Sequence, residues 1–498
     1  MGKFDWFATA RKIYQREGAI PFFYQYANHL PGALARGAHR AYAAGARALS
    51  PRRFAQWQIY SVKQELLAGH SVAHETLESA VQLALHSADT AWARGKDREA
   101  SALIADTLDV LFHPSQALRE GSDFVVSAQP TAELRSSTAV QALTTKRERV
   151  RPAFPSEPGK LLLAYRGTDR FFADQAEYLE SQGWEIERFD ADQHRDVLEE
   201  ISSRSLALRA TRIARGEKVG LVPALQAAVE SADVIWVEWG NAFAAYLSQA
   251  QLDKPVIIRI HRYEAQTQWP QFIETSGLDA MVFVADWVRQ VVNMHRPALA
   301  HVPQFVIPLG LDAARFDRPK LSGFEKTLAL VGWNSPRKDP DWAINVLDVL
   351  NEKSSGWKLK LVGGNVGANS EWGRALTHRI AEHASSIELM GYRTDMNVVF
   401  QEVGYLISAS RSEGIHTVVM EGAAARCVPV VRDWPEVKHL NGAGDIYPHE
   451  WLVNTPQEAA DRILAVPTPD AAAREFITTN MGFDTVNTEI MALVRGNF

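Results

Sequence analysis

The sequence predicts an α/β protein in which two doubly wound domains follow an all-helical region. Three observations predict this fold class. Residues 75–112 carry apolar residues at three- and four-residue spacing, as amphipathic helices do. Short apolar runs that alternate with helical stretches begin at residue 160, and a second such alternation begins after residue 316. Strands that alternate with helices form parallel sheets, whose ligands bind at the carboxyl ends of the strands.

Composition places the chain among ordinary globular proteins. Of its 498 residues, 46% are hydrophobic and 22% are charged, and this length predicts about three domains. Cys427 is the only cysteine, which excludes an internal disulfide and fits a reducing cytoplasm. The N-terminus lacks the apolar core of a signal peptide, and the uncharged stretch 19–35 contains two prolines. We therefore expect a cytoplasmic protein that is not integral to a membrane, and we expect no nucleic-acid partner.

The first 53 residues form a basic, aromatic-rich leader. They carry nine Lys or Arg and two acidic residues, although the whole chain has a net charge of −6. A leader of this kind can lie peripherally on an anionic membrane surface. The alternative is a helical arm whose aromatics pack on the protein itself. Helical additions also mediate homo-oligomers, so the sequence leaves the assembly open.

The helical region covers residues 1–150 and is interrupted at Gly95-Lys96-Asp97. Residues 151–159 contain three prolines and are predicted to be a linker. The first doubly wound domain follows at 160–308 and is completed by a C-terminal helix within 470–498. Its expected strands lie at 160–167, 184–190, 232–240, 254–261 and 279–285. The second domain spans 309–469, with strands expected at 327–333, 357–364, 386–391, 403–410 and 428–433.

Two strand ends of the second domain carry charged residues. Arg337 and Lys338 follow the first strand, and Asp339-Pro340 then opens a helix. Two cations beside a helix N-terminus form a phosphate site or, more simply, a solvated loop pair. Glu413 follows the fourth strand, in the stretch RSEGIHTVVMEG.

The helix after Glu413 is expected to begin near His416 or Thr417, which places Glu421 in its first or second turn. Its N-terminal amides suit an anion. The Glu421 carboxylate can accept hydrogen bonds from two ribose hydroxyls. The plainer interpretation is an acid favoured by the helix dipole together with a surface glutamate.

Several motifs in order resemble those of retaining GT-B glycosyltransferases of the broad GT4 type. SASRSEGIHTVVMEGAAARCVPVV (408–431) resembles their E-x7-E signature, VIPLGLDAARF (306–316) their interdomain stretch, and VGWNSPRKDP (331–340) their VG-x5-KG turn. SIELMGYRTDM (386–396) is similar to their strand-Gly loop. KPVIIRIHRYE (254–264) and LDAMVFVADWVRQVV (278–292) are similar to first-domain segments. The resemblance spans about residues 160–465 and implies a GT-B architecture, in which the two domains face a cleft.

The resemblance also implies roles for individual residues. The implied catalytic set is Glu413, which would bind hydroxyls of the transferred sugar, His261, which would contact that sugar, and Lys338, which would hold the donor diphosphate. Glu421 would bind the ribose. The complete implied donor-binding set is Arg337, Lys338, Trp333, Asn334, Gly364, Gly391, Tyr392, Gly414, Ile415, His416, Thr417 and Glu421.

The reaction implied is transfer of a sugar from a nucleotide-diphosphate sugar, UDP rather than GDP. The expected acceptor is a cell-envelope glycan, a teichoic-acid-like polymer or a lipid-linked molecule. Neither a cofactor nor a metal is expected. A front-face attack, in which a leaving-group phosphate oxygen takes the acceptor's proton, would need no separate protein base.

The sequence departs from the family pattern at two places in the site. Trp333 stands where the family has an arginine after VG, and Arg337 could replace that charge. His416 stands where the family's E-G-F-G has glycine. Either its backbone amide binds the donor, or its imidazole donates to a diphosphate or sugar hydroxyl; we favour the imidazole.

Three rival readings remain. Asp190 and Asp192 form a D-x-D pair that could chelate the metal of a GT-A transferase. A nicotinamide-dependent oxidoreductase is disfavoured because no G-x-G-x-x-G follows the first strand of either domain. The third alternative is a catalytically silent GT-B relative that binds sugar or nucleotide, or acts as a scaffold through its helical N-terminus.

Overall fold

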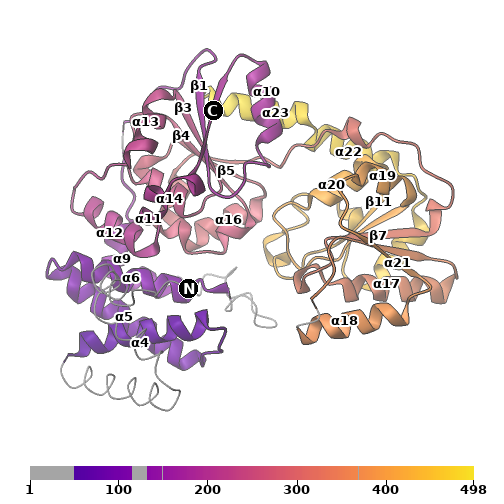
Figure 1. The fold of residues 1–498 in the computed structure, drawn as a ribbon, viewed down its shortest axis with the longest axis horizontal. Coiled ribbons are helices and arrows are strands. Elements are labelled where there is room, and N and C mark those ends of the chain that lie inside the picture. The colour runs from indigo at the N-terminus through magenta and orange to yellow at the C-terminus, as the bar shows by residue number, and fades with distance from the viewer. Residues whose placement is uncertain (1–49, 115–131, 149, 368–369) are drawn as a thin grey trace, which may run out of the picture.

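A computed structural model of the chain describes residues 50–114, 132–148, 150–367 and 370–498 (Figure 1). Almost the whole basic leader predicted for residues 1–53 therefore lies outside the described residues. Within the described ranges, every helix is too short or too polar to cross a lipid bilayer.

The N-terminal region is helical where the structure describes it. Its α-helices are α4 (Pro51–Leu67), α5 (His74–Ala93), α6 (Asp97–Leu111) and α9 (Thr138–Thr144). The predicted interruption separates α5 from α6, and Gly95 there has a φ of +68°, which favours glycine. The carboxylate of Asp106 in α6 accepts a hydrogen bond from Lys63 Nζ (2.9 Å) and another from Arg204 Nη2 of the next domain (2.6 Å). Residues 151–159 contain neither helix nor strand.

The first sheet is fully parallel, with strand order β2-β1-β3-β4-β5-β6. Its strands are β1 (Lys160–Tyr165), β2 (Glu185–Asp190), β3 (Val234–Glu238), β4 (Val256–Ile260), β5 (Ala280–Phe283) and β6 (Gln304–Val306). Its α-helices are α10 (Ala173–Ser181), α11 (Arg195–Glu200), α12 (Ser203–Ala214), α13 (Pro223–Ser231), α14 (Ala242–Ser248), α15 (Arg262–Ala265) and α16 (Asp286–His295). All five predicted strands are present. The sequence reading missed β6, which has only three residues and no fully buried face.

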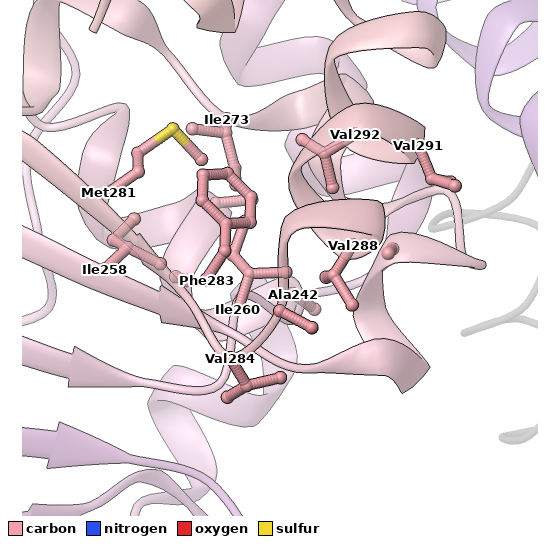
Figure 2. Close-up of a cluster of buried hydrophobic side chains, with 14 of the residues drawn as sticks. Ala242, Ile258, Ile260, Ile273, Met281, Phe283, Val284, Val288, Val291 and Val292 are labelled. Carbon is pink, nitrogen blue, oxygen red and sulfur yellow. The ribbon is translucent and has the colours of Figure 1, made fainter. Parts of the chain in front are cut away.

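Helix α16 is held against the sheet by apolar side chains. Figure 2 shows Phe283 at the end of β5 among the side chains of β4 and the valines of α16. Val288, Val291 and Val292 are fully buried, because α16 has one strongly apolar face. This packing fixes the N-terminal turn of α16, which contacts the second domain.

The second sheet is also fully parallel, with strand order β12-β11-β10-β7-β8-β9. Its strands are β7 (Thr327–Val331), β8 (Lys358–Val362), β9 (Ile387–Gly391), β10 (Tyr405–Ser408), β11 (Val428–Arg432) and β12 (Leu452–Val453). Its α-helices are α17 (Pro340–Lys353), α18 (Glu371–Glu382), α19 (Met396–Val399), α20 (Thr417–Ala424) and α21 (Pro456–Ala465). All five predicted strands are again present, and the two-residue β12 was not anticipated. The strand order runs outwards from β7 in both directions, through β8 and β9 on one side and through β10, β11 and β12 on the other. The boundary between β7 and β10 is therefore the topological switch point, where doubly wound sheets bind ligands.

The C-terminal segment differs from the single helix predicted for 470–498. It forms two helices, α22 (Ala471–Met481) and α23 (Phe483–Val494), which are separated by Gly482. A side chain at Gly482 would lie 2.3 Å from the carbonyl oxygen of Thr478, so this tight junction requires glycine. Helix α22 packs on α20 of the second domain. Helix α23 returns to the first domain beside α10, where Val486, Ile490 and Leu493 join its core (Figure 1).

Candidate active site at the switch point

The loops after β7 and β10 meet at the switch point of the second sheet. Arg337 and Lys338 lie in the first loop, and Glu413 and His416 lie in the second. The backbone N–H of Arg411 donates to the carbonyl of Arg337 (2.9 Å), and Arg337 Nη1 donates to the carbonyl of Ser412 (2.8 Å). The two loops that the sequence singled out are therefore joined by direct hydrogen bonds.

Glu413 is at the centre of this cluster. Its side chain is buried, and its Oε1 lies 2.6 Å from Arg337 Nη1 and 2.6 Å from Lys338 Nζ. Ser410 Oγ donates to the same oxygen (2.8 Å). Burial alone would raise the pKa of Glu413, but the positive charges of Lys338 and Arg337 outweigh it and hold the pKa well below the ordinary value. Glu413 is therefore an ionised acceptor over the whole physiological pH range.

The hydrogen-bond partners of His416 determine its tautomer. Its Nε2 lies 2.9 Å from Lys338 Nζ, which can only donate, so Nε2 accepts. Nδ1 must then carry the proton, and it donates to Ser408 Oγ (2.8 Å). Burial, together with the charge of Lys338, lowers the pKa of His416 to about 3. His416 is consequently a neutral acceptor that orients Lys338.

The sequence predicts two possible roles for His416, in which either its backbone N–H or its imidazole N–H donates to the substrate. In this structure both N–H groups already donate to protein atoms. The ring N–H donates to Ser408, and the backbone N–H donates to Tyr447 Oη (3.2 Å). Helix α20 begins at Thr417, as predicted, with His416 as its N-cap residue. Ile415 and Thr417 are half-buried on either side.

Glu421 lies in the second turn of α20, half-buried. No hydrogen bond or ion pair from the described part of the chain reaches its carboxylate. Burial raises the pKa of Glu421 to about 7, although Arg315 opposes the shift. A half-buried carboxylate without a protein partner is suited to accept hydrogen bonds from a ligand.

The remaining predicted donor-binding residues follow β7, β8 and β9. Trp333 is only 2% exposed and belongs to the core of the second domain, where its indole N–H has no partner among the described residues. Asn334 is exposed, and a side chain at Gly364 would lie 3.5 Å from its Nδ2. Gly391 ends β9 with a φ of +67°, and the neighbouring Tyr392 is 80% exposed. Within the described part of the chain, no hydrogen bond or ion pair joins this group to the Glu413 cluster.

His261 follows β4 of the first sheet and belongs to a buried network. Its Nε2 lies 2.7 Å from Oε1 of Glu238, and the second carboxylate oxygen, Oε2, accepts from Arg259 Nε (2.9 Å) and from Trp236 Nε1 (3.0 Å). Burial opposes ionisation of Glu238, but Arg259 and His261 lower its pKa to about 2. Because Glu238 is an ionised acceptor, Nε2 of His261 carries the proton, and in the neutral ring Nδ1 is left as an acceptor.

The two domains touch at the Glu413 loop. Trp287 Nε1 in α16 donates to the backbone carbonyl of Glu413 (3.0 Å). A side chain at Gly414 would lie 3.1 Å from Arg262 Cβ and 3.2 Å from Val284 Cγ2, so the first domain packs tightly against this position. The carboxyl-end loops of both sheets therefore meet at the candidate site.

Arg262 adds a third cation, supplied by the first domain. Its Nη1 donates to Gln266 Oε1 (2.8 Å). Burial lowers the pKa of Arg262, and Arg337 lowers it further, while Glu413 raises it. Arg262 Cβ lies 3.1 Å from the position that a side chain at Gly414 would take, so Arg262 lies beside the loop that carries Glu413.

Sequence reasoning missed several residues of this site. Arg262 directly follows the predicted His261, and a charge immediately after a buried strand was a usable signal. Trp287 gave none, because in the run DWVRQVV it reads as an ordinary core residue. Tyr447 lies outside the recognised motifs. Ser408 begins one of them, but it belongs to a predicted strand, so its contact with His416 becomes visible only in the fold.

The D-x-D pair has a structural role. The carboxylate of Asp190 accepts from the backbone N–H of Asp192 (3.0 Å) and so caps the turn after β2. Asp192 Oδ1 pairs with Arg166 Nε (2.9 Å). Strand β2 lies at the outer edge of the first sheet, away from the Glu413 loop. The geometry does not favour the GT-A interpretation.

Comparison with known proteins agrees with this architecture. Residues 325–467 match the family model of glycosyl transferases group 1. No curated protein matches the chain. A solved glycosyltransferase from Rickettsia africae is 13% identical and has a TM-score of 0.50, over 69% of this chain and 99% of that one. At this identity the likeness concerns the fold, and it agrees with the GT-B fold predicted from the sequence.

Two other solved structures are similar in the same way. Anabaena HepE in complex with UDP is 14% identical, with a TM-score of 0.49 over 68% of this chain and 100% of that one. Sucrose-phosphate synthase from Thermosynechococcus elongatus is 15% identical, with a TM-score of 0.47 over 69% and 99%. The family match covers the domain that holds Arg337, Lys338, Glu413 and Glu421. Residues 325–467 are therefore similar to group 1 glycosyl transferases, which agrees with the glycosyltransferase class predicted from the sequence.

Proposed function

We propose that the chain is a retaining, GT4-like glycosyltransferase that transfers a sugar from a nucleoside diphosphate sugar. The observation that carries the proposal is the pairing of Arg337 and Lys338 with Glu413 at the switch point of the second sheet. The reaction must stabilise a departing nucleoside diphosphate, and fixed cations do so most effectively in a partly desolvated site.

Each residue of the cluster has a distinct role in this proposal. Arg337 and Lys338 bind the diphosphate, and Arg262 approaches it from the first domain. Once a diphosphate engages the two cations, the carboxylate of Glu413 accepts hydroxyls of the transferred sugar. Glu421 accepts the ribose hydroxyls, because its carboxylate has no competing partner in the described part of the chain.

The proposed chemistry proceeds on one face of the sugar. The bond from the anomeric carbon to the leaving phosphate oxygen breaks, and a bond to the acceptor oxygen forms on the same face. The acceptor's proton passes to the leaving phosphate oxygen, so no protein base is required. We assign His261 to contact the donor sugar through Nδ1, since Nε2 is held by Glu238. Because arginine and lysine supply the positive charge, we expect no metal requirement.

The acceptor side is proposed from the wider features of the chain. A helical N-terminal region and a basic leader favour a large or membrane-associated acceptor, such as a cell-envelope glycan, a teichoic-acid-like polymer or a lipid-linked molecule. UDP is proposed ahead of GDP as the nucleotide, and the cytoplasmic side of a membrane as the location. Co-sedimentation with anionic vesicles, with and without residues 1–53, tests the membrane contact; equal binding by both chains would refute it.

A catalytically silent scaffold is the second candidate. Its support is limited to the size of the helical region, whereas Lys338, Glu413 and Glu421 are all present and Lys338 is held in place by His416. Incubation with UDP-, GDP- and ADP-sugars and a panel of glycan acceptors decides between the two. Nucleotide release with an α-linked product from an α-linked donor, read by proton NMR, supports the enzyme. Inversion of the anomeric configuration would contradict the retaining mechanism, and binding without turnover across the panel would favour the scaffold.

A further inference from the structure

A basic cavity lies between the end of the helical region and the first sheet domain. It has a volume of about 170 Å³, well above the ~15 Å³ that one water molecule requires. Its lining residues are Lys146, Arg147, Glu148, Arg151, Thr275, Ser276, Leu278, His301 and Val302. The segment 146–151 reads KRERVR, which contains four basic residues and one acidic residue. From this segment the cavity lining includes three basic residues, Lys146, Arg147 and Arg151, and one acidic residue, Glu148.

The cavity is separate from the candidate active site. Leu278 lies two residues before β5, and Val302 lies two residues before β6. Both therefore mark the amino ends of parallel strands. His261, in contrast, follows the carboxyl end of β4. The cavity thus opens at the edge of the first sheet opposite to the one that meets the second domain.

Arg147, one of the basic residues of the cavity wall, already has an acidic partner within the protein. Arg147 Nη1 pairs with Glu274 Oε2 (2.7 Å), and the backbone N–H of Arg147 donates to Thr275 Oγ1 (3.0 Å). Ser276 Oγ donates to Glu274 Oε1 (3.0 Å). These bonds tie the helical region to the first sheet domain and hold the inner wall of the cavity rigid.

Two side chains of the rim have no such partner. No hydrogen bond or ion pair to the described residues reaches the side chain of Arg151 or of His301, and both are exposed. The fully buried Arg296 lies behind the wall, within electrostatic range of Arg147 and Glu274. The local charge is consequently positive, and the unused donors point to an anionic ligand.

We propose that this cavity binds a phosphate group, with Arg151 and His301 as its principal donors. The planar guanidinium of Arg151 can bind two phosphate oxygens at once, and the apolar floor of Leu278 and Val302 accommodates the carbon atoms of a phosphomonoester. The phosphate can belong to a soluble ester or to a lipid headgroup at a membrane surface. The assignment does not depend on glycosyl transfer.

The test is calorimetric titration of the full chain with inorganic phosphate and with glycerol phosphate. We expect Arg151→Gln and His301→Asn each to weaken binding about tenfold or more, as the loss of a charge-assisted hydrogen bond does. Arg151→Lys keeps the charge but loses the two-point geometry, so it should retain part of the affinity. Arg318→Gln is the matched control, because Arg318 is likewise exposed and its side chain has no recorded partner in the described part of the second domain.

Vesicles distinguish the two sources of phosphate. If the ligand is a lipid headgroup, Arg151→Gln also reduces co-sedimentation with phosphatidylglycerol vesicles relative to wild type. If only glycerol phosphate binding falls, the ligand is a soluble ester. Unchanged phosphate affinity in both Arg151→Gln and His301→Asn would overturn the proposal, as would a loss of phosphate binding in Lys338→Ala instead.

Discussion

The indole N–H of Trp287, in the first domain, donates to the backbone carbonyl of Glu413 in the second (3.0 Å). Trp287 is fully buried, and Gly414 packs directly against Arg262 and Val284. The loop that carries the central acid of the candidate site is therefore held from both domains. This single hydrogen bond couples the position of Glu413 to the packing of α16.

Replacement of Trp287 by phenylalanine removes that coupling. Trp287→Phe should lower the free energy of unfolding by ~1–3 kcal/mol, because a buried carbonyl loses its donor. It should also raise the KM for the nucleotide sugar. Trp184→Phe is the matched control, since Trp184 is buried in the same domain and its indole N–H has no described partner. Equal KM values in the two variants would show that the Trp287 bond does not position the site.

Lys338 should be the most sensitive cation of the cluster. We expect Lys338→Ala to reduce kcat by about 10²- to 10³-fold, the usual cost of losing one electrostatic stabiliser of a leaving group. Lys353→Ala, at a surface lysine that pairs with Asp461 in the same domain, should leave kcat unchanged. Steady-state kinetics measure both, and wild-type turnover by Lys338→Ala would remove Lys338 from the mechanism.

His416 is a positioning residue whose Nε2 accepts from Lys338. His416→Leu and His416→Gly remove this acceptor and should lower kcat about ten- to a hundredfold, as the loss of a hydrogen bond to a charged group does. His416→Gln supplies a carbonyl oxygen and should recover part of the activity. With a pKa of about 3, His416 should contribute no ionisation to the wild-type pH–rate profile between pH 5 and pH 8. A histidine-like titration that disappears in His416→Gln would contradict the assigned tautomer.

Glu421 should make nucleotide binding dependent on pH. Burial raises its pKa to about 7, and only the ionised carboxylate accepts from both ribose hydroxyls. Affinity for the nucleotide should therefore increase from pH 6 to pH 8 in wild type and stay flat in Glu421→Gln. A steep pH dependence that persists in Glu421→Gln would assign it to another group.

The raised pKa of Glu421 also makes the stability of the fold depend on pH. Nucleotide affinity should increase with pH, whereas stability should decrease. The folded state binds the Glu421 proton more tightly than the unfolded state, so stability falls as pH rises from about 4.5 to 7. Glu421→Gln should therefore gain stability over wild type at pH 8 and show little difference at pH 4. Urea denaturation at the two pH values measures this.

Glu238 has the reverse linkage, because Arg259 and His261 lower its pKa to about 2. The stabilisation it provides is complete above its ordinary value of about 4.5 and is lost as pH falls towards 2. Glu238→Gln leaves Arg259 buried without its counter-ion and should cost ~3–5 kcal/mol at pH 7. The stability difference between this variant and wild type should shrink below pH 4 in acid unfolding; a difference constant with pH would contradict the ion pair.

Much of this fold could be predicted from the sequence because buried parallel strands are short apolar runs with a clear alternation. The three-residue β6 and two-residue β12 were missed, since neither is long enough to show a pattern. Gly482 was not recognised as a helix break, because its role depends on the crossing between domains.

For the site, the loops that carry Arg337, Lys338 and Glu413 could be predicted because each directly follows a strand of a parallel sheet. The partners of His416 could not, since they depend on distances between side chains that are far apart in the chain. Trp333 illustrates the same limit. It was assigned to donor binding by its place in a motif, and its indole lies in the core of the second domain.

A crystal structure of the full chain with UDP tests the central claim most directly. The account predicts electron density for the diphosphate against Arg337 and Lys338, with the ribose hydroxyls within hydrogen-bond distance of Glu421. Density for UDP at any other place, or no binding of UDP, GDP or ADP at saturating concentration, would contradict it.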